Sequence, residues 1–283
     1  MKKVIITADS PCDLPKEIIE KRNITIIPLT VLLGGESYKD GQTITPAKIY
    51  KYCSENKDMP KTAAVSPADY YSVFSRFVAN GFEVVHIALS SGISSSFNNA
   101  CMAANEMNGV YCVDSKSLCT AMGLLVLKAC DFRDKGWDAK KIAKNVNLLV
   151  PKVRTSFVIN SMEYLYKGGR CSALTKFGAN VLGIKPSIAV NSQGMLDVSK
   201  KYRGKADFVY KQYIDDCLVN ASKIDKSRIV FANSGGTNSS VISYARGVFE
   251  AKGKWGEIIE ADAGCTISSH CGPKTIAVFY IMK

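Results

Sequence analysis

A nearly uninterrupted apolar run at residues 84–89 constrains the fold of this chain more than any other feature. The run is rich in β-branched residues, which favour a strand, and it shows no alternation of apolar and polar side chains. A strand of this kind is buried on both faces, as in parallel sheets that are covered by helices. We therefore expect an α/β protein with a largely parallel sheet.

In the rest of the first half, predicted strands alternate with predicted helices. Strands are predicted at residues 4–7, 24–32 and 110–113, and helices at residues 14–21, from Thr45 onward, at 100–107 and at 118–131. Asp13 is expected to be the N-cap of the first helix, and Pro46 takes the first position of the second, where proline is favoured. The repeated order of strand and helix predicts βαβ units.

The second half contains further strand patterns and a turn at Gly168 and Gly169. Strands are expected at residues 156–160, 228–232, 258–259 and 275–281, and a helix at 239–251. A chain of 283 residues with 47% apolar residues can bury one core or two. We place the boundary between residues 150 and 165, which divides the chain into domains of residues 1–158 and 159–283.

The composition indicates a soluble, cytoplasmic protein. The apolar stretch from Val4 to Ala8 ends at Asp9, so it is shorter than the roughly 7 to 15 apolar residues of a signal peptide. No apolar run approaches the ~18 residues of a membrane span. The ten cysteines are scattered without a CxxC pair, and we expect them to be reduced thiols.

The chain has 37 basic and 25 acidic residues, a formal net charge of +12. The basic residues are spread in small groups, with no arginine-rich arm and no basic stretch interleaved with aromatic residues. Nucleic-acid binding is therefore not expected. An acidic protein partner, or transient contact with an anionic membrane surface, suits this charge better.

The serine-rich segment ALSSGISSSFNNA at residues 88–100 joins the strand at 84–89 to a predicted helix. The first amides of a helix have no partner within the helix, and the helix dipole favours negative charge there. A turn with five serine hydroxyls at this point can hold a carboxylate or a phosphate.

The chain has two histidines, His86 and His270. His86 lies inside the apolar strand and is expected to be a core residue hydrogen-bonded to backbone. His270 follows two serines before the last strand, so we place it on a loop, where it could either bind an anion or have only a structural role. A hydrolase with Ser94 as nucleophile and His270 as base stays open, although residues 90–95 do not form a GxSxG motif.

Other chemistry finds little support. Neither GxxxxGK[ST] nor GxGxxG occurs, and the glycine-rich segment 233–240 is expected to be a plain turn between a strand and a helix. Cys265, His270 and Cys271 are too few for a convincing metal site. We expect no metal and no cofactor.

Several ordered motifs together resemble the DegV family of bacterial fatty-acid-binding proteins, which includes the binding subunits of fatty acid kinase. They are TADSPCDLP at residues 7–15, IIPLTVLLGGESYKDG at 26–41, PKTAAVSP at 60–67, SSGISSSFNNA at 90–100, DSKSLCTAMGLLVL at 114–127, SMEYLYKGGR at 161–170, IKPSIAV at 184–190 and HCGP at 270–273. The resemblance runs almost from end to end.

The resemblance implies a two-domain α/β fold, with a largely parallel sheet and flanking helices in the N-terminal domain and a mixed sheet in the C-terminal domain. One long-chain fatty acid, such as palmitate or oleate, would lie between the domains. Thr62 and Ser94 match the residues that bind its carboxylate, and His270 matches a residue of the surrounding hydrogen-bond network. Arg170 and Arg203 match positions near the carboxylate opening or the kinase-docking face.

The function implied is a non-catalytic carrier that presents the carboxylate to a separate fatty acid kinase, which makes acyl phosphate for phospholipid synthesis. The alternative is a serine-dependent lipid or ester hydrolase. The sequence departs from the family pattern at Ala63 and Ala64, where relatives usually carry Ser and Gln, and at Lys274, where they carry glycine. The run around Arg203 is also less basic than in relatives, so kinase docking follows less directly than binding.

Overall fold

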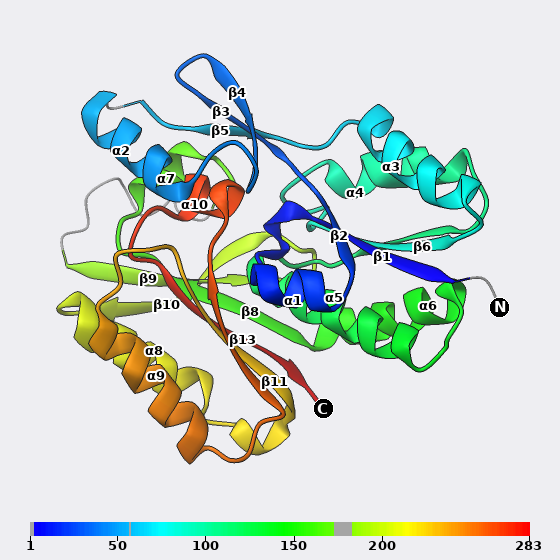
Figure 1. Ribbon diagram of the computed structural model, residues 1–283. Coiled ribbons are helices and arrows are strands. Elements are labelled where there is room, and N and C mark those ends of the chain that lie inside the picture. The colour runs from blue at the N-terminus through cyan, green and yellow to red at the C-terminus, as the bar shows by residue number, and fades with distance from the viewer. Residues whose placement is uncertain (1–2, 57, 173–182) are drawn as a thin grey trace.

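The computed structural model describes residues 3–56, 58–172 and 183–283, and these form three sheets with helices around them (Figure 1). One sheet is four-stranded and entirely parallel, one is six-stranded and mixed, and a small third sheet is antiparallel. This arrangement confirms the α/β fold class with a parallel and a mixed sheet.

The parallel sheet has the strand order β2-β1-β6-β7, with helices on both faces. Its strands are β1 (Val4–Asp9), β2 (Ile24–Ile27), β6 (Glu83–Ala88) and β7 (Val110–Asp114); the helices beside it are α1 (Lys16–Lys21), α3 (Pro67–Ala79), α4 (Ser96–Asn105) and α6 (Ala139–Leu149). β6 is buried along nearly its whole length, as its apolar sequence predicts. His86 on β6 is a core residue as expected, but its Nδ1 lies 2.9 Å from the Thr7 hydroxyl oxygen instead of a backbone atom.

The mixed sheet has the order β10-β9-β8-β13-β11-β12, and only β11 and β12 pair in parallel among these strands. Its strands are β8 (Val153–Val158), β9 (Ile184–Val190), β10 (Leu196–Arg203), β11 (Ile224–Asn233), β12 (Glu257–Asp262) and β13 (Ile276–Met282). Helices α8 (Ala206–Cys217) and α9 (Ser239–Ala251) cover one face, and their apolar residues form a core with that face of the sheet.

The antiparallel sheet has the order β4-β3-β5 and packs with two helices beside the larger sheets. It contains β3 (Thr30–Leu33), β4 (Glu36–Lys39) and β5 (Lys61–Ala63); the helices are α2 (Pro46–Asn56) and α10 (Cys265–Cys271), and the short α7 (Glu163–Lys167) contacts α10. α10 comes from the end of the chain, so this small unit joins distant parts of the sequence. Short 3₁₀ turns complete the chain: η1 (Ser10–Cys12), η2 (Val150–Lys152) and η4 (Ala221–Lys223).

Two further local predictions, for residues 24–32 and for Asp13, were wrong. The extended run 24–32 is two strands in different sheets, because Pro28 has no backbone N–H to continue a ladder and the chain turns there. Asp13 is not the N-cap of α1, which begins two residues after Leu14. Asp13 instead ends η1 in the left-handed backbone region, with φ of 45°, and its carboxyl group is buried.

The predicted domain boundary at residue 158 stays a prediction, but the position of β8 bears on it. β8 pairs with β13 and β9 in the mixed sheet, although residues 153–158 precede that boundary. The chain leaves the layer of the parallel sheet after α6 and η2. We therefore propose that the division falls near residue 152.

Helix α5 (Cys119–Asp134) lies between the two large sheets and contacts strands of both. Its first twelve residues are buried except Lys128, and a helix that is apolar on all sides is one that neighbours enclose. At Gly123 a β-carbon would lie only 2.8 Å from the carbonyl oxygen of Cys12, so glycine allows η1 to approach the helix. α5 thus joins the two halves of the molecule in one core.

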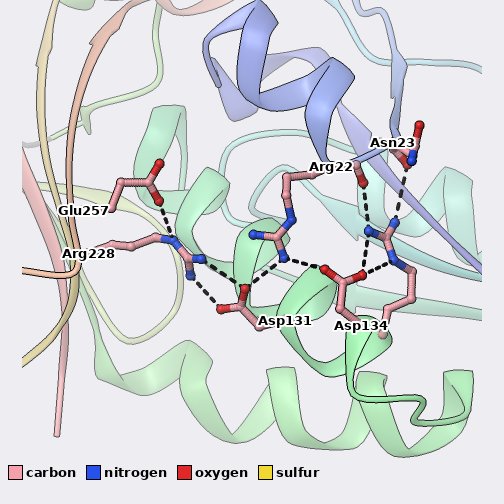
Figure 2. Close-up of polar contacts among 7 residues, drawn as sticks. Arg22, Asn23, Asp131, Asp134, Arg228 and Glu257 are labelled. Atoms are coloured by element: carbon pink, nitrogen blue, oxygen red, sulfur yellow. Dashed lines mark hydrogen bonds and ion pairs between the residues drawn. The ribbon is translucent and has the colours of Figure 1, made fainter.

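The last turn of α5 connects both sheets through ion pairs (Figure 2). Asp131 accepts hydrogen bonds from Arg22, after α1, at 2.8 Å, and from both terminal nitrogens of Arg228, on β11, at 2.6 and 3.0 Å. Arg228 also donates to Glu257 on β12 at 3.0 Å. Burial raises the pKa of Asp131, but the hydrogen bonds and charges of Arg228 and Arg22 outweigh it and hold the pKa below its ordinary value.

We expect Asp131→Asn to lower the free energy of unfolding by about 2 kcal/mol at pH 7, because two largely buried guanidinium groups lose their shared carboxylate. Urea denaturation measures the loss. Asp134→Asn is the control, since Asp134 pairs with Arg22 and Arg133 but is half exposed, and its loss should stay below about 1 kcal/mol. Equal losses of unfolding free energy in the two variants would contradict the role of Asp131 as the carboxylate shared by Arg22 and Arg228.

Candidate functional site

Residues from many separate parts of the chain line one cavity of about 60 Å³ at the start of α5. Four of the five predicted site residues lie there, namely Thr62, Ser94, Arg170 and His270. Arg203 is absent from the lining and lies exposed at the end of β10. The remaining wall is mostly apolar: Leu29, Ala63, Ala64, Leu89, Ile93, Leu118, Phe157, Leu165, Leu196, Thr266, Ile267 and Cys271.

His270 lies in the last turn of α10, not on a loop as its neighbours suggested. The serines before it are buried and support the helix: Ser269 donates to the carbonyl oxygen of Cys265 at 2.7 Å, and Ser268 to that of Ala263 at 3.1 Å. These serines, a residue type that favours loops, therefore bond to backbone carbonyls at and just before the start of their own helix.

The imidazole of His270 pairs with Thr62 on β5, with 2.8 Å between Nε2 and the hydroxyl oxygen. The other ring nitrogen, Nδ1, is buried without a hydrogen-bond partner. It faces Gly168, where any β-carbon would overlap it, so the first glycine of the KGGR segment provides room for the ring. The geometry fixes the imidazole with Nε2 toward Thr62.

Burial, assisted by the positive charge of Arg170, lowers the pKa of His270 to about 4. The ring is therefore neutral at pH 7, and one of its nitrogens carries a proton while the other accepts. Arg170 itself is exposed and donates to the carbonyl oxygen of Gly168 at 2.8 Å. It adds positive charge at the rim of the cavity.

Ser94 lies in the turn between β6 and α4, where the predicted strand, serine turn and helix are all present. Its hydroxyl oxygen accepts from the backbone N–H of Ser96 at 3.1 Å and lies 2.9 Å from the Ser96 hydroxyl. This contact orients the Ser94 side chain at the start of the helix.

The same turn packs against the hairpin between β9 and β10. Ser90 donates to the carbonyl oxygen of Gly194 at 2.8 Å, and a β-carbon on Gly92 would lie 2.5 Å from the carbonyl carbon of Gly194. The absence of a side chain at Gly92 therefore lets the mixed sheet support the serine turn.

A second, smaller cavity of about 30 Å³ shares four wall residues with the first: Leu118, Phe157, Ile267 and Cys271. Its other walls come mainly from β11 and β13 and are largely apolar, for example Ala232, Ala277 and Phe279. The two cavities adjoin at these four residues near the start of α5, and together they are called the apolar track. The sequence pattern could not separate these wall residues from ordinary core.

Within residues 3–56, 58–172 and 183–283, no group of three or more His, Cys, Asp and Glu side chains is placed to hold a metal ion. In the same part of the chain no helix has the length and apolar character that would cross a bilayer.

Comparison with known proteins decides the family. A model of the DegV family of uncharacterised proteins matches residues 3–283. The chain belongs to the DegV family. A DegV domain-containing protein of Clostridium acetobutylicum is 30% identical over the full length of both chains, and one of Caldanaerobacter subterraneus is likewise 30% identical over both.

Solved DegV structures share the fold. A fatty-acid-binding DegV family protein of Thermus thermophilus superposes with a TM-score of 0.90 at 24% identity, covering 99% of this chain and 100% of its own. A stearic-acid-binding protein of Eubacterium ventriosum gives a TM-score of 0.84 at 27% identity, covering 100% and 99%. A DegV lipid-binding protein of Thermotoga maritima gives 0.85 at 25% identity, with the same coverage.

The depressed pKa of His270 predicts a stability loss in acid. The unfolded state binds a proton below about pH 6.5, whereas the folded state does so only near pH 4, so stability falls as the pH drops between these values. The loss from this group is at most about 3 kcal/mol. Urea titrations at several pH values should show that His270→Gln loses less stability than the wild type between pH 6.5 and 4. Parallel curves would contradict the assignment.

Proposed function

We propose that this protein binds one long-chain fatty acid, such as palmitate or oleate, with the carboxylate at Thr62 and Ser94 and the acyl chain along the track beside α5. The observation that carries the proposal is that Thr62 on β5, Ser94 in the turn after β6 and His270 on α10 line one cavity. A smaller, largely apolar cavity shares four of its wall residues. Related proteins of the same fold that bind stearic acid or lipid support it.

The Thr62–His270 pair explains how a hydroxyl group would be prepared for a carboxylate. With the proton of the neutral imidazole on Nε2, His270 donates to the Thr62 oxygen, and the hydrogen of Thr62 is then available to the ligand. A carboxylate only accepts hydrogen bonds, so a Thr62 hydroxyl that is free to donate suits it. Each such charge-assisted bond contributes about 1.5–3 kcal/mol.

The acyl chain would supply most of the affinity. Burial of each methylene contributes about 0.8 kcal/mol, so a long tail outweighs the few polar contacts. The cavities are small beside the ~150 Å³ that holds one benzene in an engineered protein. Binding therefore requires the walls around Leu118, Phe157 and Ile267 to separate.

We propose further that the bound carboxylate is presented to a separate fatty acid kinase and that the protein acts in the cytoplasm as a carrier for phospholipid synthesis. The exposed Arg170 at the rim supports this, because its charge would attract both the carboxylate and an acidic partner surface. Arg203 is exposed farther away and is assigned to docking only.

The hydrolase alternative has less geometric support. A serine hydrolase needs its histidine bonded to the nucleophile on one nitrogen and held by an acid on the other. Here Nε2 of His270 bonds Thr62, Ser94 bonds Ser96, and Nδ1 faces Gly168. Labelling of the protein by a fluorophosphonate probe, lost in Ser94→Ala, would overturn the carrier interpretation.

The double variant Thr62→Val, Ser94→Ala should weaken palmitate binding at least about 100-fold, because two charge-assisted hydrogen bonds are lost. Displacement of a fluorescent fatty acid measures the affinity. Ser95→Ala is the matched control, since Ser95 is exposed and its side chain makes no capping bond at the start of α4. Unchanged palmitate affinity in the double variant would contradict the assignment of the carboxylate to this site.

Presentation to a kinase is tested separately. The variants Arg170→Ala and Arg203→Ala should retain palmitate within about threefold but slow acyl-phosphate formation by an added fatty acid kinase at least about tenfold, most strongly at low salt. Lys201→Ala on the same strand is the control for a general loss of positive charge. Full acyl-phosphate formation in both arginine variants would contradict the docking role.

A further inference from the structure

Thr266 has a buried hydroxyl group that faces the candidate site without a partner. It lies on α10, is 3% exposed, and lines the 60 Å³ cavity. Its hydroxyl oxygen makes no hydrogen bond within the described ranges. The neighbouring Ser269 satisfies its hydroxyl on the backbone four residues earlier, as serine and threonine in helices commonly do.

A buried hydroxyl group without a partner destabilises a folded protein, because it loses its hydrogen bonds to water and gains none in return. Among the buried unpartnered atoms in the described part of the chain, those on the cavity wall belong to Thr266 and His270. Nδ1 of His270 faces Gly168, and the other nitrogen of the ring bonds Thr62. Thr266 is then the one whose partner would come from a bound molecule.

The position of Thr266 sets where that partner must be. Thr266 precedes His270 by four residues, so both lie on the same face of α10 with about 5–6 Å between their β-carbons. Thr266 lines the first cavity and is absent from the apolar second one. It therefore borders the part of the ligand close to the carboxylate and not the acyl tail.

Other wall residues do not supply the missing partner. Ala63 and Ala64, which line the same cavity, have no polar side-chain atoms. Thr62 and Ser94 already bond His270 and Ser96, and their remaining capacity is assigned to the carboxylate. A polar group on the first carbons of the acyl chain would meet Thr266 and satisfy it.

We propose that the ligand is a long-chain fatty acid with a hydroxyl group on carbon 2 or 3, and that Thr266 hydrogen-bonds this hydroxyl. The inference rests on the proposed function and specifies its ligand. A hydroxyl group both donates and accepts, so it matches the threonine whichever way its hydrogen points. A site with a buried hydrogen-bonding group discriminates against ligands that leave it unpaired.

The test compares palmitate, 2-hydroxypalmitate and 3-hydroxypalmitate as competitors of a fluorescent fatty acid on the full chain. The wild type should bind one hydroxy acid at least about tenfold tighter than palmitate, equivalent to one hydrogen bond. Thr266→Val, nearly equal in shape, should remove the preference, whereas Thr266→Ser should keep it. Thr237→Val is the matched control, because Thr237 also has a buried unpartnered hydroxyl but does not line the cavity.

The outcomes separate this inference from the function on which it rests. Equal binding of all three acids by the wild type, or a preference that survives in Thr266→Val, overturns the role of Thr266 and leaves fatty-acid binding intact. Failure of folded wild-type protein to bind any of the three acids overturns both. If Thr266→Val does not fold, the wild-type preference and its retention in Thr266→Ser decide the question.

Discussion

The enclosure of α5 between two sheets is the constraint on which the rest of the structure depends. A helix apolar on every side cannot stand at a surface, so each sheet must present an apolar face to it. That requirement gives the molecule its layers, with α3 and α4 outside one sheet and α8 and α9 outside the other. It also places the start of α5, at Leu118 and Cys119, beside the two cavities and its last turn at the ion pairs of Asp131.

The polar end of the site is assembled from segments that are distant in the sequence. Thr62 comes from a small antiparallel sheet, Ser94 from the turn after a parallel strand, and His270 from a helix near the end of the chain. Two glycines make the assembly possible, since Gly168 gives room to the imidazole and Gly92 lets the serine turn meet the opposite hairpin. The site therefore depends on close backbone approaches as much as on its polar groups.

The sequence predicted the parts of this structure that rest on local pattern. β6, α5 and α9 followed from apolar periodicity, and family motifs pointed to Thr62, Ser94, Arg170 and His270, which line one cavity. The strand break at Pro28 and the helical position of His270 were missed, because a single proline and a pair of buried serines carry tertiary information that local preferences do not show.

Thr266 was missed for a related reason. The sequence shows that Thr266 lies four residues before His270. That spacing places the two residues on one face only if the segment is a helix, which the sequence did not predict. Its lack of a partner appears only when every neighbouring element is in place. The wall residues Leu118, Phe157 and Ile267 likewise differ from core residues only in what they face.

The ion pairs at Asp131 have a mechanical consequence. They hold one end of α5 to a residue before β2 and to β11, while the other end borders the cavities. If the two sheets separate while these ion pairs hold, the gap between them would be narrowest at Asp131 and widest at Leu118. The gap would then be widest where the carboxyl end of a fatty acid would lie, and the sheets would stay together near Asp131.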